Sequence, residues 1–297
     1  MRGWREIGAF GALGLVWGSE WMVVRSIDLP PLRSLAIRYA LAAVILVVAG
    51  RVRRKKTAGA GVWGLSAFSG ATLVALPTVL TVWASGRLSP GLLVVILAMT
   101  PLIAALLEGR ARGALLAPLV GGMGGTALLA SQGLSFASIQ WAGAAAALAA
   151  AISIAWSVIF VRRRLPEVGV ATLAAIQLGV SAALLGVSSL AMEGRFSFSL
   201  TAEGWFFEML LAVFGAAVAF PLYYWLLGRT ESFELTAVQW VVTVLGVAEG
   251  LVLVREAPSL RMGAGTAIVA ASLATLCRAG NGDDAPVTIL TRRPDGG

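Results

Sequence analysis

The chain has 297 residues, of which 58% are apolar and 13% charged, with a net charge of +8 and a mean hydropathy of +0.86. This composition excludes an ordinary water-soluble domain and predicts an integral membrane protein surrounded by the lipid bilayer. Histidine is absent and Cys277 is the single cysteine, so the sequence excludes an internal disulfide, histidine-based hydrolysis and the usual zinc sites; we expect no cofactor, no metal and no enzymatic activity.

The apolar runs, taken in chain order, predict an all-α membrane protein with ten transmembrane helices. A bilayer core about 30 Å thick needs about 20 apolar residues for each helical crossing. Strands of a membrane β-barrel would alternate with polar residues, whereas stretches 41–49 and 142–151 are apolar on every side. The predicted spans are 7–26, 32–50, 62–85, 88–107, 113–131, 139–161, 168–191, 205–227, 234–254 and 259–278.

The first span carries a carboxylate within its apolar run. Arg2 and Arg5 precede this run as in a secretory signal, but no small-residue cleavage site follows, so we interpret it as a retained span. Glu20 lies about two-thirds of the way along, where an ionised carboxylate needs a partner. It is predicted either to bind a substrate amine or exchange a proton, or else to lie at the outer interface.

The second span contains Arg38, for which three interpretations are open. Its guanidinium could bind a substrate carboxylate, pair with a carboxylate of a neighbouring helix, or extend to the outer headgroups. We favour the second interpretation, a structural or gating pair. The basic run over 51–56 follows this span, and because it lacks interleaved aromatic residues we predict no nucleic-acid binding.

The distribution of positive charge predicts the orientation of the chain. Of the 23 Lys and Arg residues, sixteen lie at the termini and after spans two, four, six and eight, six lie on the other side, and Arg38 is within a span. Positive residues near short loops are retained in the cytoplasm. We therefore expect both termini to be cytoplasmic, in the cytoplasmic (inner) membrane.

A repeated motif predicts that the chain is duplicated. The pattern Trp-x-x-Gly-Arg begins at Trp83 and again at Trp225, and further matches at similar offsets pair Pro77 with Pro221 and Trp17 with Trp156. Five spans per half is an odd number, so the halves would be inverted repeats with a substrate site between them. The predicted division is 1–135 and 136–278 for the repeats, and 279–297 for a disordered C-terminal tail.

The ninth span has a polar stripe on one face. Thr236, Gln239, Thr243 and Gly246 follow steps of three or four residues, and Glu249 lies deeper in the same span. Because lipid would penalise such a face, it should point toward a cavity, our preferred interpretation, or toward a neighbouring helix.

Aromatic residues supply a second candidate lining for a cavity. Trp17 and Trp156 are deep and related by the repeat, whereas Trp83 and Trp225 lie nearer to span ends, where aromatic residues commonly anchor a protein to the interface. Pro77, Pro101 and Pro221 should interrupt the helical hydrogen bonds of spans three, four and eight.

One set of residues is informative by its order and spacing: Trp17-Gly18, Pro31, Arg38, Tyr39, Pro101, the glycines at 121, 122, 124 and 125, and Glu256. In these residues the chain resembles the drug/metabolite transporter superfamily, in its ten-span, EamA-like branch. The resemblance covers about residues 5–278. Two departures are that the first half has no Glu matching Glu256 and that span nine lacks the Pro found in span four.

This resemblance implies an exporter of small amphipathic metabolites, most closely amino acids and among them aromatic ones, that works by alternating access. A proton-coupled exporter of cationic drugs using Glu20 is one alternative, and a non-transporting membrane scaffold, which would have no water-filled cavity, is another. The partners expected are a small-molecule substrate and the bilayer. The predicted substrate-binding residues are Trp17, Glu20, Thr78, Trp83, Thr100, Trp156, Tyr223, Tyr224, Gln239, Trp240 and Thr243, and the predicted structural or gating charges are Arg38, Glu249 and Glu256.

Overall fold

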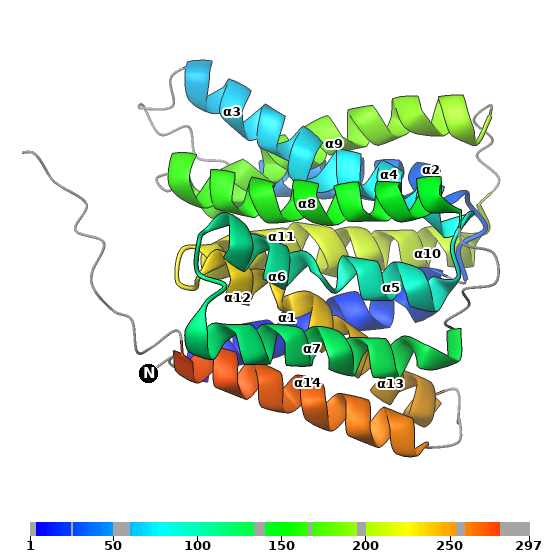
Figure 1. Ribbon diagram of the computed structural model, residues 1–297. Coiled ribbons are helices and arrows are strands. Elements are labelled where there is room, and N and C mark those ends of the chain that lie inside the picture. The colour runs from blue at the N-terminus through cyan, green and yellow to red at the C-terminus, as the bar shows by residue number, and fades with distance from the viewer. Residues whose placement is uncertain are drawn as a thin grey trace, which may run out of the picture.

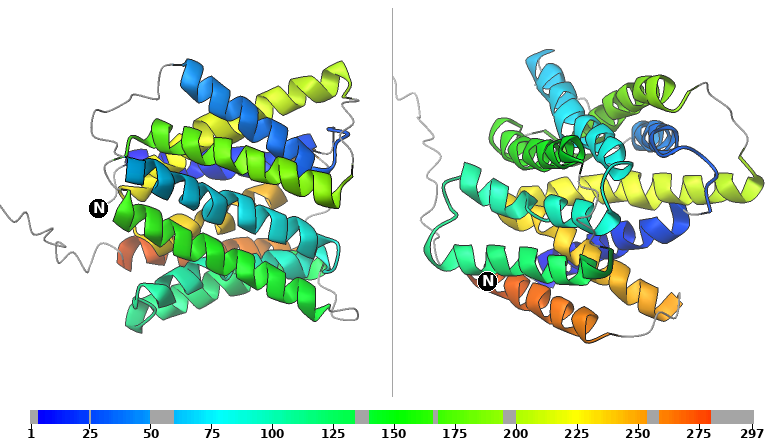
Figure 2. Two further views of the ribbon diagram at one scale, coloured as in Figure 1. Left: turned by 90° about the horizontal axis from the view of Figure 1, so that it is seen from above. Right: turned by 45° about the vertical axis from the view of Figure 1, so that its right-hand side comes forward.

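A computed structural model describes residues 4–24, 26–49, 60–133, 140–165, 168–194, 200–253 and 259–279. All secondary structure in these ranges is helical, and the helices run side by side through the molecule (Figures 1 and 2). The all-α prediction is confirmed, and each of the ten predicted spans holds a helical segment. The predicted disordered tail, apart from its first residue, lies outside the described residues.

The helical segments have the following bounds. Spans one to five are α1 (Trp4–Val24), α2 (Pro31–Val48), α3 (Ala60–Gly70) with η1 (Ala71–Ala75) and α4 (Leu76–Ser85), α5 (Pro90–Leu97) with α6 (Thr100–Leu107), and η2 (Gly113–Leu115) with α7 (Leu116–Leu129) and η3 (Ala130–Gly133). Spans six to ten are α8 (Trp141–Arg164), α9 (Val170–Met192), α10 (Ala202–Leu210) with η4 (Leu211–Val218) and α11 (Ala219–Leu227), α12 (Ser232–Thr236) with α13 (Val238–Leu253), and α14 (Leu260–Ala279).

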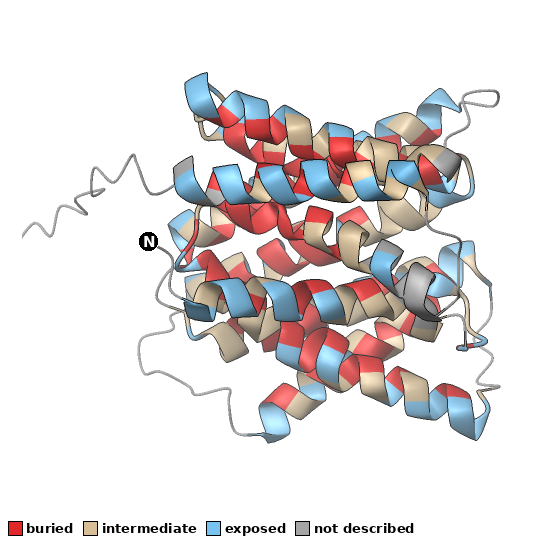
Figure 3. Cartoon of the chain, turned by 90° about the horizontal axis from the view of Figure 1, so that it is seen from below, coloured by how far each residue is buried: buried red, intermediate tan, exposed pale blue. Residues whose placement is uncertain are grey.

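Length and composition identify the segments best suited to cross a bilayer. Six stretches of the described chain have at least 18 residues and enough apolar character to do so, at 31–48, 61–85, 90–107, 141–164, 170–192 and 202–227. Three shorter apolar helices lie at 113–129, 232–245 and 260–276. Side chains on the outer faces of the bundle are exposed, and buried ones concentrate between the helices (Figure 3).

Spans three and eight both contain a π-helical segment that ends shortly before a proline. Proline lacks an amide hydrogen and crowds the carbonyl four residues earlier, so the ladder must widen near Pro77 and Pro221. Neighbouring helices contact the backbone carbonyls there: the Ser153 hydroxyl donates to the Thr72 carbonyl at 2.6 Å, and the Trp17 indole donates to the Gly215 carbonyl at 3.1 Å. These segments therefore join the two halves of the chain.

Span four is broken rather than widened. α5 ends at Leu97 and α6 begins at Thr100, one residue before Pro101. The Trp240 indole of α13 donates to the Ala98 carbonyl at 3.0 Å, which satisfies a group at the break. The interruptions expected at the three prolines are thus present in all three spans.

The main helix pairs each unite one helix from either half of the chain. α2 packs on α9, α7 on α14, α1 on α13, and α8 on both α4 and α6. α7 and α14 lie side by side along one edge of the molecule (Figure 1). α8 is the first helix of the second half, as α1 is of the first, and α13 and α6 each belong to the fourth span of their half. The contacts α1–α13 and α8–α6 therefore correspond to each other, as expected for two copies of one repeat.

Glycines permit several of these contacts. A side chain at Gly122 would overlap the Trp240 ring, and a Cβ at Gly70 would lie 2.7 Å from the Gln177 Cα. Gln177 is fully buried in α9, donates to the Ser69 hydroxyl at 2.6 Å and accepts from the Tyr224 hydroxyl. Close backbone approach and a neutral hydrogen-bond network therefore hold spans three, seven and eight together.

Candidate functional site

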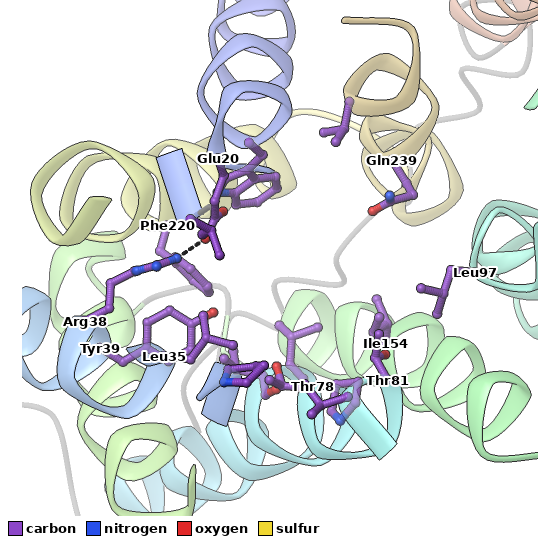
Figure 4. A pocket seen from close by; sticks show the side chains of 18 of the residues that line it. Glu20, Leu35, Arg38, Tyr39, Thr78, Thr81, Leu97, Ile154, Phe220 and Gln239 are labelled. Carbon is purple, nitrogen blue, oxygen red and sulfur yellow. Dashed lines mark hydrogen bonds and ion pairs between the residues drawn. The ribbon is translucent and has the colours of Figure 1, made fainter. Parts of the chain in front are cut away.

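A cavity of about 530 Å³ lies in the middle of the helix bundle. Its walls come from spans one, two, three, four, six, eight and nine. Figure 4 shows side chains from these elements around one hollow. At one end the cavity reaches Ile27 and Leu29, where the chain passes from α1 to α2. A scaffold without an internal cavity does not match this structure.

The charged side of the cavity is a cluster centred on Arg38. The Arg38 guanidinium forms an ion pair with the Glu20 carboxylate (Figure 4), and its Nε lies 3.4 Å from a Glu208 oxygen. The Ser34 hydroxyl accepts from Arg38 at 3.2 Å and donates to Glu208 at 2.9 Å. The side chains of Arg38 and Glu208 are 2% and 0% exposed, whereas that of Glu20 is 25% exposed. Glu20 is therefore the charged group of the cluster that a ligand can reach.

The cluster contains two carboxylates and one guanidinium. Buried charges in a membrane are stable only when they are paired and hydrogen-bonded. Here Arg38 of span two pairs with Glu20 of span one at the cavity wall and with Glu208 of span eight, which is fully buried and does not line the cavity. When all three groups are ionised, the cluster is negative by one charge and favours a cation.

An aromatic wall adjoins this cluster. Trp17 lies 6.0 Å from Phe220 and 5.7 Å from Tyr223 between ring centroids, and Tyr39 lies 5.8 Å from Phe220. All four rings line the cavity. The Trp17 indole is fixed by its bond to the Gly215 carbonyl, so the wall is tied to the π-helical segment of span eight.

Polar groups occur on the opposite side. Gln239 of α13 points into the hollow, and Thr78 and Thr81 lie on the α4 side (Figure 4). The hydroxyls of Thr78 and Thr100 donate to carbonyls of their own helices, Val74 and Leu97, both at 2.6 Å. Each of these two hydroxyl oxygens can still accept a hydrogen bond from a ligand.

Six of the predicted substrate residues thus line one cavity: Trp17, Glu20, Thr78, Thr100, Tyr223 and Gln239. The other five lie outside it. Trp156 is 42% exposed and stacks on Phe160 with centroids 5.2 Å apart, so it faces the lipid side of α8. Ile154, two residues earlier, is the α8 residue that lines the cavity.

The remaining four outside residues have structural contacts. Tyr224 donates to Gln177, and the fully buried Trp240 fills the space beside Gly122. The Thr243 hydroxyl donates to the Gln239 carbonyl at 3.0 Å. Trp83 packs under the Arg87 guanidinium, which lies 3.6 Å from its ring centroid.

Two predicted charges cannot be placed, and several residues of the site were not predicted. The side chain of Glu249 in α13 is not described, and Glu256 lies outside the described residues. We did not predict Ser34, Tyr39 or Phe220, which line the cavity, or Glu208, the buried partner of Arg38. The rule that singled out Glu20, a carboxylate inside an apolar span, applies equally to Glu208 and would have found it.

A second charged cluster lies at the ends of three spans. Arg162, in the last turn of α8, forms an ion pair with Glu231 and lies 3.9 Å from Glu108, the residue after α6. Glu231 also caps α12 in a reciprocal capping box with Glu234. Burial raises the pKa of the Glu108 carboxyl, and the positive charge of Arg162 opposes this effect.

Comparisons with known proteins give a consistent result. A family model described as the EamA-like transporter family matches residues 6–110 and 141–278. One solved crystal structure is similar with a TM-score of 0.76 and 18% identity, over 93% of this chain and 98% of its own; at this identity the likeness shows the fold alone. No curated protein matches the sequence.

Proposed function

Because the chain belongs to the EamA-like transporter family, a family of membrane transporters, we propose that it exports small amphipathic metabolites, with amino acids as the substrate class. The observation that carries this proposal is the single cavity in which an aromatic wall adjoins an accessible carboxylate. Its volume of about 530 Å³ is in the range of small-molecule sites.

The two sides of the cavity fit the two ends of an amino acid. The Glu20 carboxylate would hold the ammonium group, and Trp17, Phe220 and Tyr223 would contact an apolar or aromatic side chain. The Gln239 amide, on the other side of the hollow (Figure 4), would donate to the substrate carboxylate. Arg38 is not assigned to the substrate because its side chain is buried and paired.

Transport would follow alternating access between the two halves, in the cytoplasmic membrane. With both termini cytoplasmic, as the charge distribution indicates, the cavity end at Ile27 and Leu29 faces the exterior. In this conformation, the protein would release its substrate to the exterior. Rocking of the paired helices α1–α13 and α8–α6 would then open the opposite side.

The test is transport in proteoliposomes with labelled amino acids. Phe220→Ala should reduce transport of aromatic amino acids at least tenfold, because the variant loses a central ring of the wall, while Trp156→Ala, a lipid-facing control, should transport at the wild-type rate. Absence of amino-acid transport by the wild-type protein, or equal loss in both variants, would overturn the assignment.

A proton-coupled exporter of cationic compounds is the second candidate, and one observation favours it. The Arg38 cluster has an excess carboxylate, and Glu20 is its exposed member. Glu20→Gln should abolish export of cationic dyes and its response to a pH gradient. An unchanged rate would remove Glu20 from the mechanism, and dye transport without amino-acid transport would favour this candidate.

A further inference from the structure

A second cavity, of about 340 Å³, lies where three spans end. It is lined by the last turn of α8, the first turn of α9 and the last turn of α11 together with Arg229. Because these helices begin or end there, the cavity lies at the level of the lipid headgroups rather than in the middle of the bilayer. It is separate from the substrate cavity and shares no lining residue with it.

The rim of this cavity holds a fixed and unneutralised cation. Arg229 Nη1 donates to the Trp225 carbonyl at 3.1 Å, and its guanidinium lies 4.0 Å from the centroid of the Trp225 ring. Arg229 is exposed and forms no ion pair with any carboxylate in the described ranges. Arg162, also at this cavity, is instead neutralised by Glu231 and Glu108. The free positive charge at this site therefore belongs to Arg229.

The walls below the rim are apolar. Leu165, Leu173 and Leu227 line the cavity and are almost fully buried, with exposures of 4%, 3% and 3%. A small soluble anion would satisfy the arginine but would leave these walls without a partner. A molecule with a phosphate next to hydrocarbon chains satisfies both, and anionic lipids collect beside basic residues at membrane faces.

We propose that this cavity binds an anionic phospholipid, with Arg229 holding the phosphate and the apolar walls contacting the glycerol backbone and the first acyl carbons. The cation–π contact and the carbonyl bond hold the guanidinium in one position, so binding does not have to order it. The site goes beyond the transport proposal and does not depend on it.

The first copy of the repeated motif supplies a matched control. Arg87 Nη1 donates to the Trp83 carbonyl at 2.9 Å and stacks on the Trp83 ring, as Arg229 does on Trp225. There, however, α8 packs directly on the motif: a Cβ at Gly143 would lie 2.9 Å from the Arg87 Cβ. Arg87 lines neither cavity. The two arginines share their local contacts and differ in the space beside them.

Native mass spectrometry of the purified full chain would measure binding of phosphatidylglycerol, phosphatidylcholine, glycerol 3-phosphate and inorganic phosphate. Wild-type protein should prefer phosphatidylglycerol. Arg229→Gln should weaken this binding about fivefold, the usual effect of one basic residue near a membrane, while Arg87→Gln should stay within about twofold of wild type. Arg229→Lys, which keeps the charge, should retain part of the preference, and Val168→Trp should lower it by filling the cavity.

Four outcomes would overturn the proposal. The first two are equal binding of phosphatidylcholine and phosphatidylglycerol, and equal losses of phosphatidylglycerol binding in Arg229→Gln and Arg87→Gln. The third is unchanged phosphatidylglycerol binding in Arg229→Gln or Val168→Trp. The fourth is binding of glycerol 3-phosphate and inorganic phosphate as tight as that of phosphatidylglycerol. If Arg229→Gln does not fold, Arg229→Lys and Val168→Trp still decide the question.

Discussion

The Arg38 cluster and the Arg162 cluster have the same composition but different surroundings. Each consists of one arginine and two glutamates from three separate segments. In the first, the side chains of Arg38 and Glu208 are almost completely buried within the spans; in the second, Arg162 and Glu231 are 33% and 29% exposed at the span ends. Solvent can reach Arg162 and Glu231 when a partner is lost, but it cannot reach Arg38 or Glu208. Similar ion pairs should therefore differ greatly in their effect on stability.

The largest difference is expected for Arg38→Met. This substitution leaves Glu20 and Glu208 close together without a cation, which should cost about 3–5 kcal/mol of unfolding free energy. Unfolding by sodium dodecyl sulfate titration from mild detergent micelles would measure it, with Arg38→Lys as the control that keeps the charge. A loss below about 1 kcal/mol would show that the buried cluster tolerates a missing partner, and the comparison would fail.

Glu20→Gln should have an intermediate effect on stability. Arg38 keeps Glu208 and Ser34 as partners, and the partly exposed position of Glu20 moderates the cost, so we expect a loss of about 1.5–3 kcal/mol. The same unfolding assay applies. A loss as large as that of Arg38→Met would mean that Glu208 does not share the guanidinium.

Arg162→Gln should change stability by no more than about 1 kcal/mol, because exposed ion pairs contribute little. Screening gives an independent check: 1 M salt should reduce the small effect of Arg162→Gln and leave that of Arg38→Met nearly unchanged. If Arg162→Gln instead destabilises as strongly as Arg38→Met, exposure does not explain the difference between the clusters.

The smallest effect is a pH dependence from Glu108. Its carboxyl pKa is raised by burial, so the folded state binds a proton that the unfolded state has already lost. The stabilisation is complete below the ordinary value of 4.5 and is lost as the pH rises through the raised pKa. As the pH rises from 4.5 through the raised pKa of Glu108, the wild-type protein should therefore lose stability relative to Glu108→Gln. A constant difference between pH 4 and pH 8, or one of opposite sign, would contradict this prediction.

The sequence predicted the spans well and the orientation of their side chains less well. Ten apolar runs separated by charged, Pro- or Gly-containing breaks were sufficient to place the helices, because their length is imposed by the bilayer. Which face points inward is harder to infer, since lipid and protein interior are both apolar. For this reason Trp156, chosen as the counterpart of Trp17, lies on the outer face, while Ile154 reaches the cavity.

Ionisable residues were more informative than aromatic ones. Glu20 and Arg38 were identified individually because charges inside spans are costly. Their pairing with Glu208 and Ser34 depends on contacts between distant helices, which no local pattern contains. The repeated Trp-x-x-Gly-Arg motif indicated the duplication, but Trp83 and Trp225 line no part of the central cavity. Their carbonyls and rings hold arginines at the ends of α4 and α11.

The short separation between Glu20 and Arg38, 18 residues along the chain, has a consequence for biogenesis. At about 5–20 residues per second, the two residues leave the ribosome within about one to four seconds of each other. The first helical hairpin can thus enter the bilayer as a neutralised pair, long before Glu208 is synthesised. Insertion of this charged pair does not have to wait for translation of the second half of the chain.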